Sequence, residues 1–432
     1  MSGQIPKAPP LRFSLPPTES SEGGRLSSAA DGRARTPAAP WKRNRFNEIA
    51  MRKSTMGNAA ALPRVEYEDV IPFSGYFNND IFAKSSDKIG IQFSEGDVLF
   101  GKLRPYLGNW MLAEFKGLAV GDWWVLKSTG VVSEFLYTLI QTPSFQDVAN
   151  QSVGSKMPRA DWSLVSEALF YCPNNPVEQH RIGSFFRTVD VLIAVREKAL
   201  GKLEALKKSM LLKMFPQGDA LVPEVRFKGF EGEWERRRLG GAFNLEMSTN
   251  TLSRAKLSQM GTVRNVHYGD VLIKYGSVLD VANAAMPFIA DDQFKCDRKN
   301  RLSDGDIIMA DTAEDETAGK VTEIRGVGVE LIVAGLHTLV LRPNEEYGYG
   351  FLGYCMNAPG YHESLLSVMQ GSKVLSINKS ALLGSAFLAP SFLEQQKIGA
   401  YFRSLDALIA ARREEVEKLR QMKKALLERM FV

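Results

Sequence analysis

Residues 178–215 read EQHRIGSFFRTVDVLIAVREKALGKLEALKKSMLLKMF, and residues 394–431 read EQQKIGAYFRSLDALIAARREEVEKLRQMKKALLERMF. The two segments align without a gap at a constant offset of 216 residues, and 18 of the 38 aligned positions are identical. Units of a solenoid repeat are adjacent in sequence, whereas these copies are separated by a long stretch of unlike sequence. The repeat therefore predicts two large units, each closed by the same helical segment.

Apolar residues in both segments recur at seven-residue spacing. The first segment has one row at Ile182, Val189, Leu203 and Met210 and a second row at Phe185, Leu192, Ala199 and Leu206; the other segment repeats them at Ile398, Leu405, Leu419 and Leu426 and at Tyr401, Leu408 and Met422. A helix with such stripes needs a partner, and 38 helical residues span roughly 57 Å. We expect two long helices, over residues 176–216 and 392–432, that pack as an antiparallel coiled coil. Two ordinary amphipathic core helices are the alternative, and Gly201 argues against a straight rod.

The rest of the chain also reads as a tandem duplication. Residues 1–40 hold seven prolines and many serines and glycines, which predicts a disordered lead-in. Beyond it, Trp41–Phe46 is echoed by Trp234–Leu239, Gly96–Leu99 by Gly305–Ile308, and Gly154–Lys156 by Gly371–Lys373. Strand-like and helix-like segments alternate between these landmarks. We expect two mixed α/β (α+β) globular domains, at residues 41–175 and 217–391, with one fold and different specificities.

Composition limits the class of protein. With 432 residues and 44% hydrophobic content, the chain can hold two or three domains with real cores. It has no run of 18 apolar residues and no apolar segment near its start, so we expect neither a membrane span nor a secretory signal. Three scattered cysteines fit a reducing compartment, so a cytoplasmic location is expected. The four histidines show no close pairing with cysteine, and no metal site is expected.

Patterns that carry enzyme chemistry are incomplete. Gly96–Lys102 has the spacing GxxxxGK, but Leu103 stands where a phosphate-binding loop needs Ser or Thr to hold Mg²⁺. Asp97 with Glu114 and Lys116 imitates a metal-dependent nuclease site, a spacing that often arises by chance in a charged chain. The acidic run at residues 304–316 lacks EF-hand spacing. We therefore expect no catalytic residue, no cofactor and no metal in this chain.

The net charge of +5 is unevenly distributed. Residues 1–45 carry 8 basic and 3 acidic groups, and the two repeated segments carry 8 against 4 and 9 against 6. The remaining residues hold 29 basic and 36 acidic groups, a net of −7. A domain that binds phosphates over its whole face is expected to be basic, so any affinity for DNA must come from local patches.

In its repeated segments and in several stretches between them, the chain resembles the specificity subunit of type I restriction-modification systems. The pattern EQxxIGxxFRxxDxLIAxR with the terminal Lys-Lys and Met-Phe is similar to that family's repeated regions. Residues 222–239 (VPEVRFKGFEGEWERRRL) resemble the start of its second target-recognition domain, and residues 305–320, 333–338 and 371–373 resemble parts of that domain. Residues 96–108 (GDVLFGKLRPYLG) are similar to a common first-domain version. The resemblance covers about residues 41–432, and the lead-in before them is longer than expected.

The resemblance implies a non-catalytic, DNA-binding subunit. Each target-recognition domain recognises one half of an interrupted site on double-stranded DNA, while the helices set the gap and dock two methyltransferase subunits. Those partners bind S-adenosylmethionine and methylate adenine N6. With two added restriction subunits, the complex uses ATP and Mg²⁺ to cleave unmodified DNA. Two other functions stay open: a coiled-coil scaffold that binds two copies of another partner without reading sequence, and a self-sufficient DNA nuclease or methyltransferase.

Two sets of residues are predicted from these patterns. Candidates for DNA contact are Lys102, Arg104, Lys156, Arg159, Lys274, Tyr275, Lys320, Arg325 and Lys373. Candidates for helix–helix packing or partner docking are Ile182, Phe186, Val189, Ile193, Leu203, Ile398, Phe402, Leu405, Ile409 and Leu419. For each basic residue in the first set the alternative is a solvated surface charge, and Lys156 and Lys373 are also candidates for supporting the domain framework.

Overall fold

The computed structural model describes residues 41–84, 86–151, 156–291 and 294–431, and the predicted lead-in lies outside them. The chain divides into two compact units. The first unit holds the residues up to Ala199 together with those from Arg412 onward, and the second unit holds Leu200–Ala411. Each unit therefore combines one globular part with a portion of both long helices.

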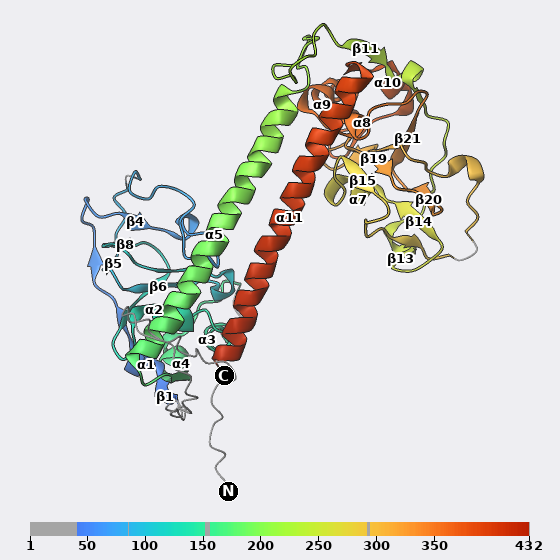
Figure 1. Cartoon of the computed structure of the whole chain (residues 1–432). Coiled ribbons are helices and arrows are strands. Elements are labelled where there is room, and N and C mark those ends of the chain that lie inside the picture. The colour runs from blue at the N-terminus through green and yellow to red at the C-terminus, as the bar shows by residue number, and fades with distance from the viewer. Residues whose placement is uncertain (1–40, 85, 152–155, 292–293, 432) are drawn as a thin grey trace, which may run out of the picture. The chain divides into compact units, whose positions relative to one another are not determined.

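The two repeated segments form the long helices α5 (Pro176–Lys213) and α11 (Phe392–Met430) (Figure 1). Within the first unit, Asp190 pairs with Lys423 and the later residue Arg196 pairs with the earlier residue Glu415, so the helices run antiparallel. Helix α5 continues through Gly201 without a break, because helical hydrogen bonding tolerates a glycine at a modest cost. The expected pair of long antiparallel helices is confirmed.

The first unit contains two four-stranded sheets. One has the order β2-β9-β6-β7 and is antiparallel, with β2 (Ala50–Lys53), β9 (Trp123–Ser128), β6 (Val98–Gly101) and β7 (Trp110–Leu112). The other has the order β3-β5-β8-β4, with β3 (Met56–Gly57), β5 (Gly90–Phe93), β8 (Gly117–Ala119) and β4 (Arg64–Val65). Strand β1 (Lys42–Arg45) pairs with β10 (Leu169–Cys172), and the helices are α1 (Phe46–Ile49), α2 (Ser133–Leu139), α3 (Pro143–Ala149) and α4 (Trp162–Glu167).

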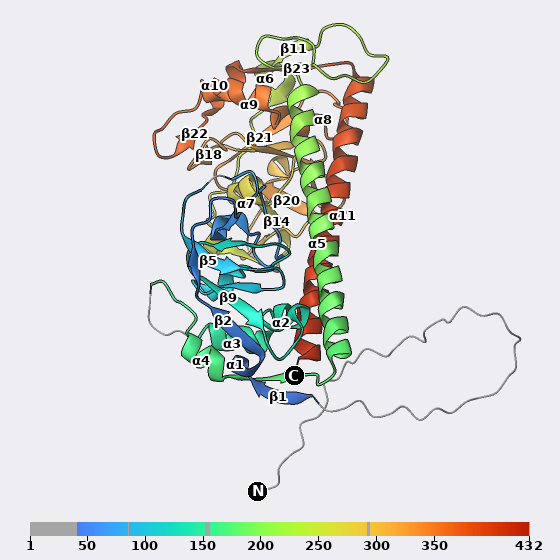
Figure 2. The same cartoon turned by 90° about the vertical axis from the view of Figure 1, so that its left-hand side faces the viewer.

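The second unit repeats this plan with additions. Its sheets are β12-β21-β17-β19-β15 and β13-β16-β14-β20. These strands are β12 (Phe243–Asn244), β21 (Thr338–Pro343), β17 (Ile307–Ala310), β19 (Val321–Arg325), β15 (Val278–Asp280), β13 (Leu257–Ser258), β16 (Phe288–Ile289), β14 (Val263–Val266) and β20 (Leu331–Ala334). Two-stranded pairs join β11 (Glu235–Arg238) to β23 (Ala386–Ala389) and β18 (Thr312–Ala313) to β22 (Leu375–Ser376). The helices are α6 (Leu239–Ala242), α7 (Tyr268–Ile273), α8 (Phe351–Met356), α9 (Pro359–Leu366) and α10 (Lys379–Gly384) (Figure 2).

Strand register shows which strands of the two units correspond. Gly101, the last residue of β6, lies opposite Trp123 at the start of β9, and Ala310 of β17 lies opposite Thr338 at the start of β21. The smaller sheets differ in one pairing, because β5 pairs with β8 whereas its counterpart β16 pairs with β14. The expected tandem duplication of one mixed α/β fold is therefore present.

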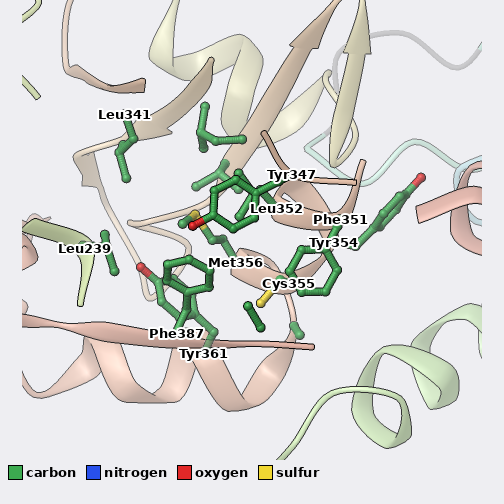
Figure 3. Close-up of a cluster of buried hydrophobic side chains, with 14 of the residues drawn as sticks. Leu239, Leu341, Tyr347, Phe351, Leu352, Tyr354, Cys355, Met356, Tyr361 and Phe387 are labelled. Carbon is green, nitrogen blue, oxygen red and sulfur yellow. The ribbon is translucent and has the colours of Figure 1, made fainter. Parts of the chain in front are cut away.

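A phenylalanine at the end of each repeated segment closes a core. Phe431 packs against Trp41, Phe135 and Phe186, with ring centroids 5.7, 5.5 and 6.3 Å away. Phe215, its repeat equivalent, packs in the same way against Trp234, Phe351 and Phe402 at 6.0, 6.1 and 5.9 Å. Figure 3 shows part of the second core, with Phe351 beside Tyr354 and Cys355. Met430 and Phe431, at the end of the second repeated segment, thus complete the core of the first unit, and Met214 and Phe215 complete the core of the second.

The predicted helix-packing residues lie on the inner faces of α5 and α11. Ile182, Phe186, Val189, Ile193, Ile398, Phe402, Leu405 and Ile409 are buried, while Leu203 and Leu419 are half-buried. In the second seven-spaced row, Phe185 and Tyr401 are half-buried against the globular cores, whereas Leu192, Leu206, Leu408 and Met422 are 39, 40, 41 and 44% exposed. These four exposed residues form the outer faces of α5 and α11.

Candidate nucleic-acid interface

Most of the predicted DNA-contacting residues of the first unit gather at the carboxyl end of its central strand, β6. The backbone N–H of Lys102, just beyond β6, donates to the carbonyl of Asp122 at 2.9 Å, and Ala160 N–H donates to the carbonyl of Lys102 at 2.8 Å. The second unit has the same framework beyond β17: Asp311 N–H donates to His337 at 3.1 Å, and Ile377 N–H donates to Asp311 at 2.8 Å. Three chain segments therefore meet at one place in each unit.

In the first unit two cations share one carboxylate at this place. Lys102 Nζ lies 3.5 Å from Asp122 Oδ1, and Arg159 Nη2 lies 3.0 Å from Asp122 Oδ2. The hydrogen bond from Arg159 lowers the pKa of Asp122 below its ordinary value. The Arg159 side chain is nevertheless 49% exposed, so this ion-pair cluster presents positive charge to solvent.

A strained turn projects next to that cluster. Arg104 has the left-handed backbone angles φ 48° and ψ 64°, and its N–H donates to Pro158 O at 2.7 Å. The following turn exposes Tyr106 (54%). Phe73, also left-handed with φ 63°, donates its N–H to Gly108 O at 2.8 Å and holds the far end of the turn. Sequence reasoning selected Arg104 but missed Tyr106 and Phe73, although an aromatic residue between Pro105 and Gly108 is a signal for an exposed turn.

The corresponding place in the second unit has different chemistry. His337, left-handed with φ 53°, lies with its Nδ1 3.6 Å from Asp311 Oδ1, and its side chain is 47% exposed. The Tyr268 ring meets the imidazole edge-on, with centroids 5.3 Å apart. Lys373 is exposed just before β22, which pairs with β18 beside Asp311. None of His337, Asp311 and Tyr268 was predicted as a DNA contact, because only the strand register brings them together.

Lys156 lies in the first unit where Lys373 lies in the second. Lys156 is exposed and precedes the segment in which Arg159 forms an isolated bridge with Leu103. In the second unit the β18–β22 pairing takes the place of that bridge. Gly154 and Ser155, the other residues of the first Gly-Ser-Lys, lie outside the described residues.

Of the other predicted contacts in the second unit, Lys320 borders this place, because the N–H of Ala310 at the end of β17 donates to Lys320 O at 2.9 Å. Tyr275 is only 5% exposed, so its ring belongs to the core. Lys320 is half-buried and donates to Leu272 O at 2.6 Å, and burial lowers the pKa of its ammonium group. Lys274 is exposed and donates to the carbonyl of Ala285. Arg325 pairs with Glu323 at 2.9 Å and ends β19, which runs antiparallel to β17. Arg325 therefore lies at the end of the sheet opposite to His337.

The patterns that imitated enzyme sites have structural partners. Asp97 accepts the N–H of Ser94 and pairs with Lys53, both at 2.7 Å. Asp306, its counterpart, accepts the N–H of Ser303 at 2.7 Å and pairs with Arg342 at 2.6 Å. Each aspartate therefore fixes the turn before a central strand. Glu114 pairs with Arg187. Among the described residues no cluster of three His, Cys, Asp or Glu side chains is arranged to bind a metal ion.

None of the helices in the described part of the chain is long and apolar enough to cross a membrane.

Sequence comparison relates the chain to specificity subunits of type I restriction enzymes, although no protein-family model matches it. It is 29% identical over 129 residues to the EcoDI type I restriction enzyme specificity subunit of Escherichia coli, a match that covers 29% of each chain. It is 21% identical over 344 residues to the MjaVIII specificity subunit of Methanocaldococcus jannaschii, covering 77% of this chain and 74% of the relative.

Comparison with solved structures gives the same result for the fold. The type I restriction-modification S subunit from M. genitalium aligns over 92% of this chain and 98% of its own length, with 14% identity and a TM-score of 0.55. A chain from a structure of type I R-M system assembly aligns over 91% and 97%, with 19% identity and a TM-score of 0.51. The resemblance seen in the sequence is thereby confirmed, and this chain has the fold of type I restriction-modification specificity subunits.

Proposed function

We propose that this chain is the sequence-specific DNA-binding subunit of a type I restriction-modification complex, in which each unit reads one half of an interrupted site on double-stranded DNA. The observation that carries the proposal is the meeting of three segments at the carboxyl end of β6 and again of β17. The backbone framework is the same in both units, while the exposed groups differ: Lys102 and Asp122 in one, Asp311 and His337 in the other. One framework with two sets of side chains suits the reading of two unlike half-sites.

The long helices fit the role of a spacer. Readers that are rigidly connected bind DNA only when their half-sites have a matching separation, and half-sites of dimeric readers lie about one helical turn, or 34 Å, apart. Helices of 38 and 39 residues reach across such a distance. The gap between the half-sites is therefore a property of α5 and α11, and the half-site sequences are properties of the globular parts.

Two methyltransferase subunits dock on the outer faces of the helices. The first unit exposes Leu192 of α5 and Met422 of α11, and the second exposes their repeat equivalents Leu408 and Leu206. Because these apolar residues are related by the repeat, one partner surface fits both places. Exposed apolar residues that recur in an ordered pattern favour a protein-binding surface. The buried residues of the inner faces hold the chain together and are not available to a partner.

The chemistry belongs to the partners. A base in a duplex must be flipped into a pocket before it is methylated, and a separate subunit supplies that pocket. The methyltransferase subunits bind S-adenosylmethionine, and two restriction subunits use ATP and Mg²⁺. This chain acts in the cytoplasm without a cofactor or catalytic residue of its own.

The decisive experiment is co-expression with the host's adenine methyltransferase subunit in a methylation-free cell, followed by mapping of N6-methyladenine. We expect a new interrupted motif that requires this chain. Association of the two proteins without methylation contradicts the proposal in favour of a scaffold. Cleavage of DNA or binding of S-adenosylmethionine by the purified chain alone would favour a self-sufficient enzyme.

A further inference from the structure

Backbone strain marks one location in each unit. Among the described residues, the left-handed residues other than glycine are Phe73, Arg104 and His337. Such a conformation is unfavourable for a residue with a Cβ atom, and it is retained where the surrounding structure enforces it. Phe73 and Arg104 lie at the two ends of the turn beyond β6, and His337 lies beside Asp311 beyond β17. All three therefore occur at the carboxyl end of the central strand.

The backbone around Arg104 and His337 is fixed while their side chains stay accessible. The backbone N–H of Arg104 donates a hydrogen bond to Pro158 O at 2.7 Å, and the backbone carbonyl of His337 accepts one from the N–H of Asp311 at 3.1 Å. The Arg104 side chain is exposed, and that of His337 is 47% exposed. Tyr268 limits the orientation of the imidazole from one side. A rigid backbone with an exposed polar group is what a reader of base edges requires, because its hydrogen bonds depend on position.

Resting on the proposed function, we infer that Arg104 and His337 are specificity-determining residues, one for each half-site. The guanidinium of Arg104 matches the paired acceptors O6 and N7 of guanine in the major groove. An imidazole presents two separate ring nitrogens in place of the guanidinium fork, so His337 contacts a different pattern of base edges. The charges beside the two residues also differ. Arg104 lies beside the Lys102–Asp122–Arg159 cluster, which has two cations and one carboxylate, whereas His337 lies beside the single carboxylate of Asp311.

The left-handed backbone provides a clean test. Glycine adopts positive φ without strain, so Arg104→Gly and His337→Gly remove a side chain while the turn is kept. Arg104→Lys keeps the positive charge but loses the two-pronged geometry. Arg43→Ala removes an exposed cation of the same unit that lies on β1, away from the turn. Each variant is co-expressed with the methyltransferase subunit, and the methylated motif is mapped against that of the unaltered chain.

Each glycine variant should relax discrimination within one half of the motif, and the two variants should affect different halves. A lost base contact corresponds to about a 10- to 100-fold loss of preference at one position. Arg104→Lys should relax a guanine in the same half as Arg104→Gly, and Arg43→Ala should leave the motif intact. An unchanged motif in either glycine variant, or both changes in one half, overturns the inference. If Arg104→Gly and Arg104→Lys both retain the full motif, Arg104 only holds a phosphate, which overturns the inference. An unaltered chain that directs no methylation contradicts the proposed function itself.

Discussion

Asp190 of α5 and Lys423 of α11 form an ion pair of 2.5 Å inside the first unit, and their repeat equivalents Asp406 and Lys207 form the same pair at 2.5 Å inside the second. The two pairs differ in burial: the side chains of Asp190 and Lys423 are 4 and 10% exposed, and those of Asp406 and Lys207 are 31 and 24% exposed. Burial outweighs the attraction of Lys423 and raises the pKa of Asp190. Nearly the same contact therefore has a different energetic weight in each unit.

Lys423→Ala should destabilise the protein by about 3–5 kcal/mol, because it leaves Asp190 buried without its countercharge. Lys207→Ala should cost about 1 kcal/mol or less, since water reaches Asp406. Replacing both members of the buried pair, Asp190→Leu with Lys423→Met, should recover most of the loss. Urea-induced unfolding followed by tryptophan fluorescence measures these differences. Equal costs for the two lysine variants would contradict this account.

The Asp122 cluster predicts a pH dependence. In the folded protein the pKa of the Asp122 carboxyl lies below its ordinary value of 3.8, mainly because Arg159 donates a hydrogen bond to it. The contribution to stability is therefore present above pH 3.8 and is lost as the pH falls through the folded-state pKa. Asp122→Asn should be less stable than the unaltered protein at pH 6, and the difference should shrink steadily below pH 3.8. Thermal unfolding across this pH range measures whether the stability difference between Asp122→Asn and the unaltered protein shrinks as the pH falls. Asp147→Asn on α3 is the control.

Two glycines of α5 should respond in opposite ways to alanine. A Cβ atom at Gly201 would meet open space, so Gly201→Ala should stabilise the helix by about 1 kcal/mol. A Cβ atom at Gly183 would lie 2.6 Å from the carbonyl carbon of Glu134 in α2. Gly183→Ala should therefore destabilise the first unit, because backbone cannot yield as a side chain can. Melting temperatures of both variants decide this, and stabilisation by Gly183→Ala would show that α5 packs on α2 less closely.

The outer helix faces predict the number of docked partners. Leu192→Asp should remove the methyltransferase subunit bound at the first unit, and Leu408→Asp the one at the second. Both positions are exposed, so a new charge should not disturb folding. Native mass spectrometry should find two methyltransferase copies on the unaltered chain, one on each single variant and none on the double variant. Leu164→Asp, on an exposed position of α4, is the control and should retain two copies.

The length of the helices should control the gap in the DNA site. Seven residues inserted after Ala199 and again after Ala411 lengthen both helices where the chain passes between its units, so the Asp190–Lys423 and Lys207–Asp406 pairs are kept. Two added turns correspond to about 10 Å, or roughly three base pairs of DNA. Methylation mapping should therefore return the same two half-sites separated by a longer gap. A changed half-site sequence would refute the assignment of spacing to the helices.

The repeat at residues 178–215 and 394–431 was sufficient to predict the two long helices and the duplication. Periodicity is a local property of the chain, so buried positions such as Ile182 and Ile398 could be identified from their spacing. The same periodicity could not assign Leu192 and Leu408 to an outer face, because that depends on which other elements cover the helix. Lys102, Arg104 and Arg159 were chosen as local basic patches, because the globular remainder of the chain carries a net charge of −7.

Sequence by itself therefore determined the elements, their duplication and the basic cluster of the first unit. Only tertiary structure decided that Asp122 joins Lys102 and Arg159, that His337 lies at the equivalent place beside Asp311, and that Tyr275 is buried. It also placed Arg325 at the far end of the sheet. These outcomes depend on the register between strands that are distant in the chain, and register follows from how whole faces pack together rather than from any short stretch of residues.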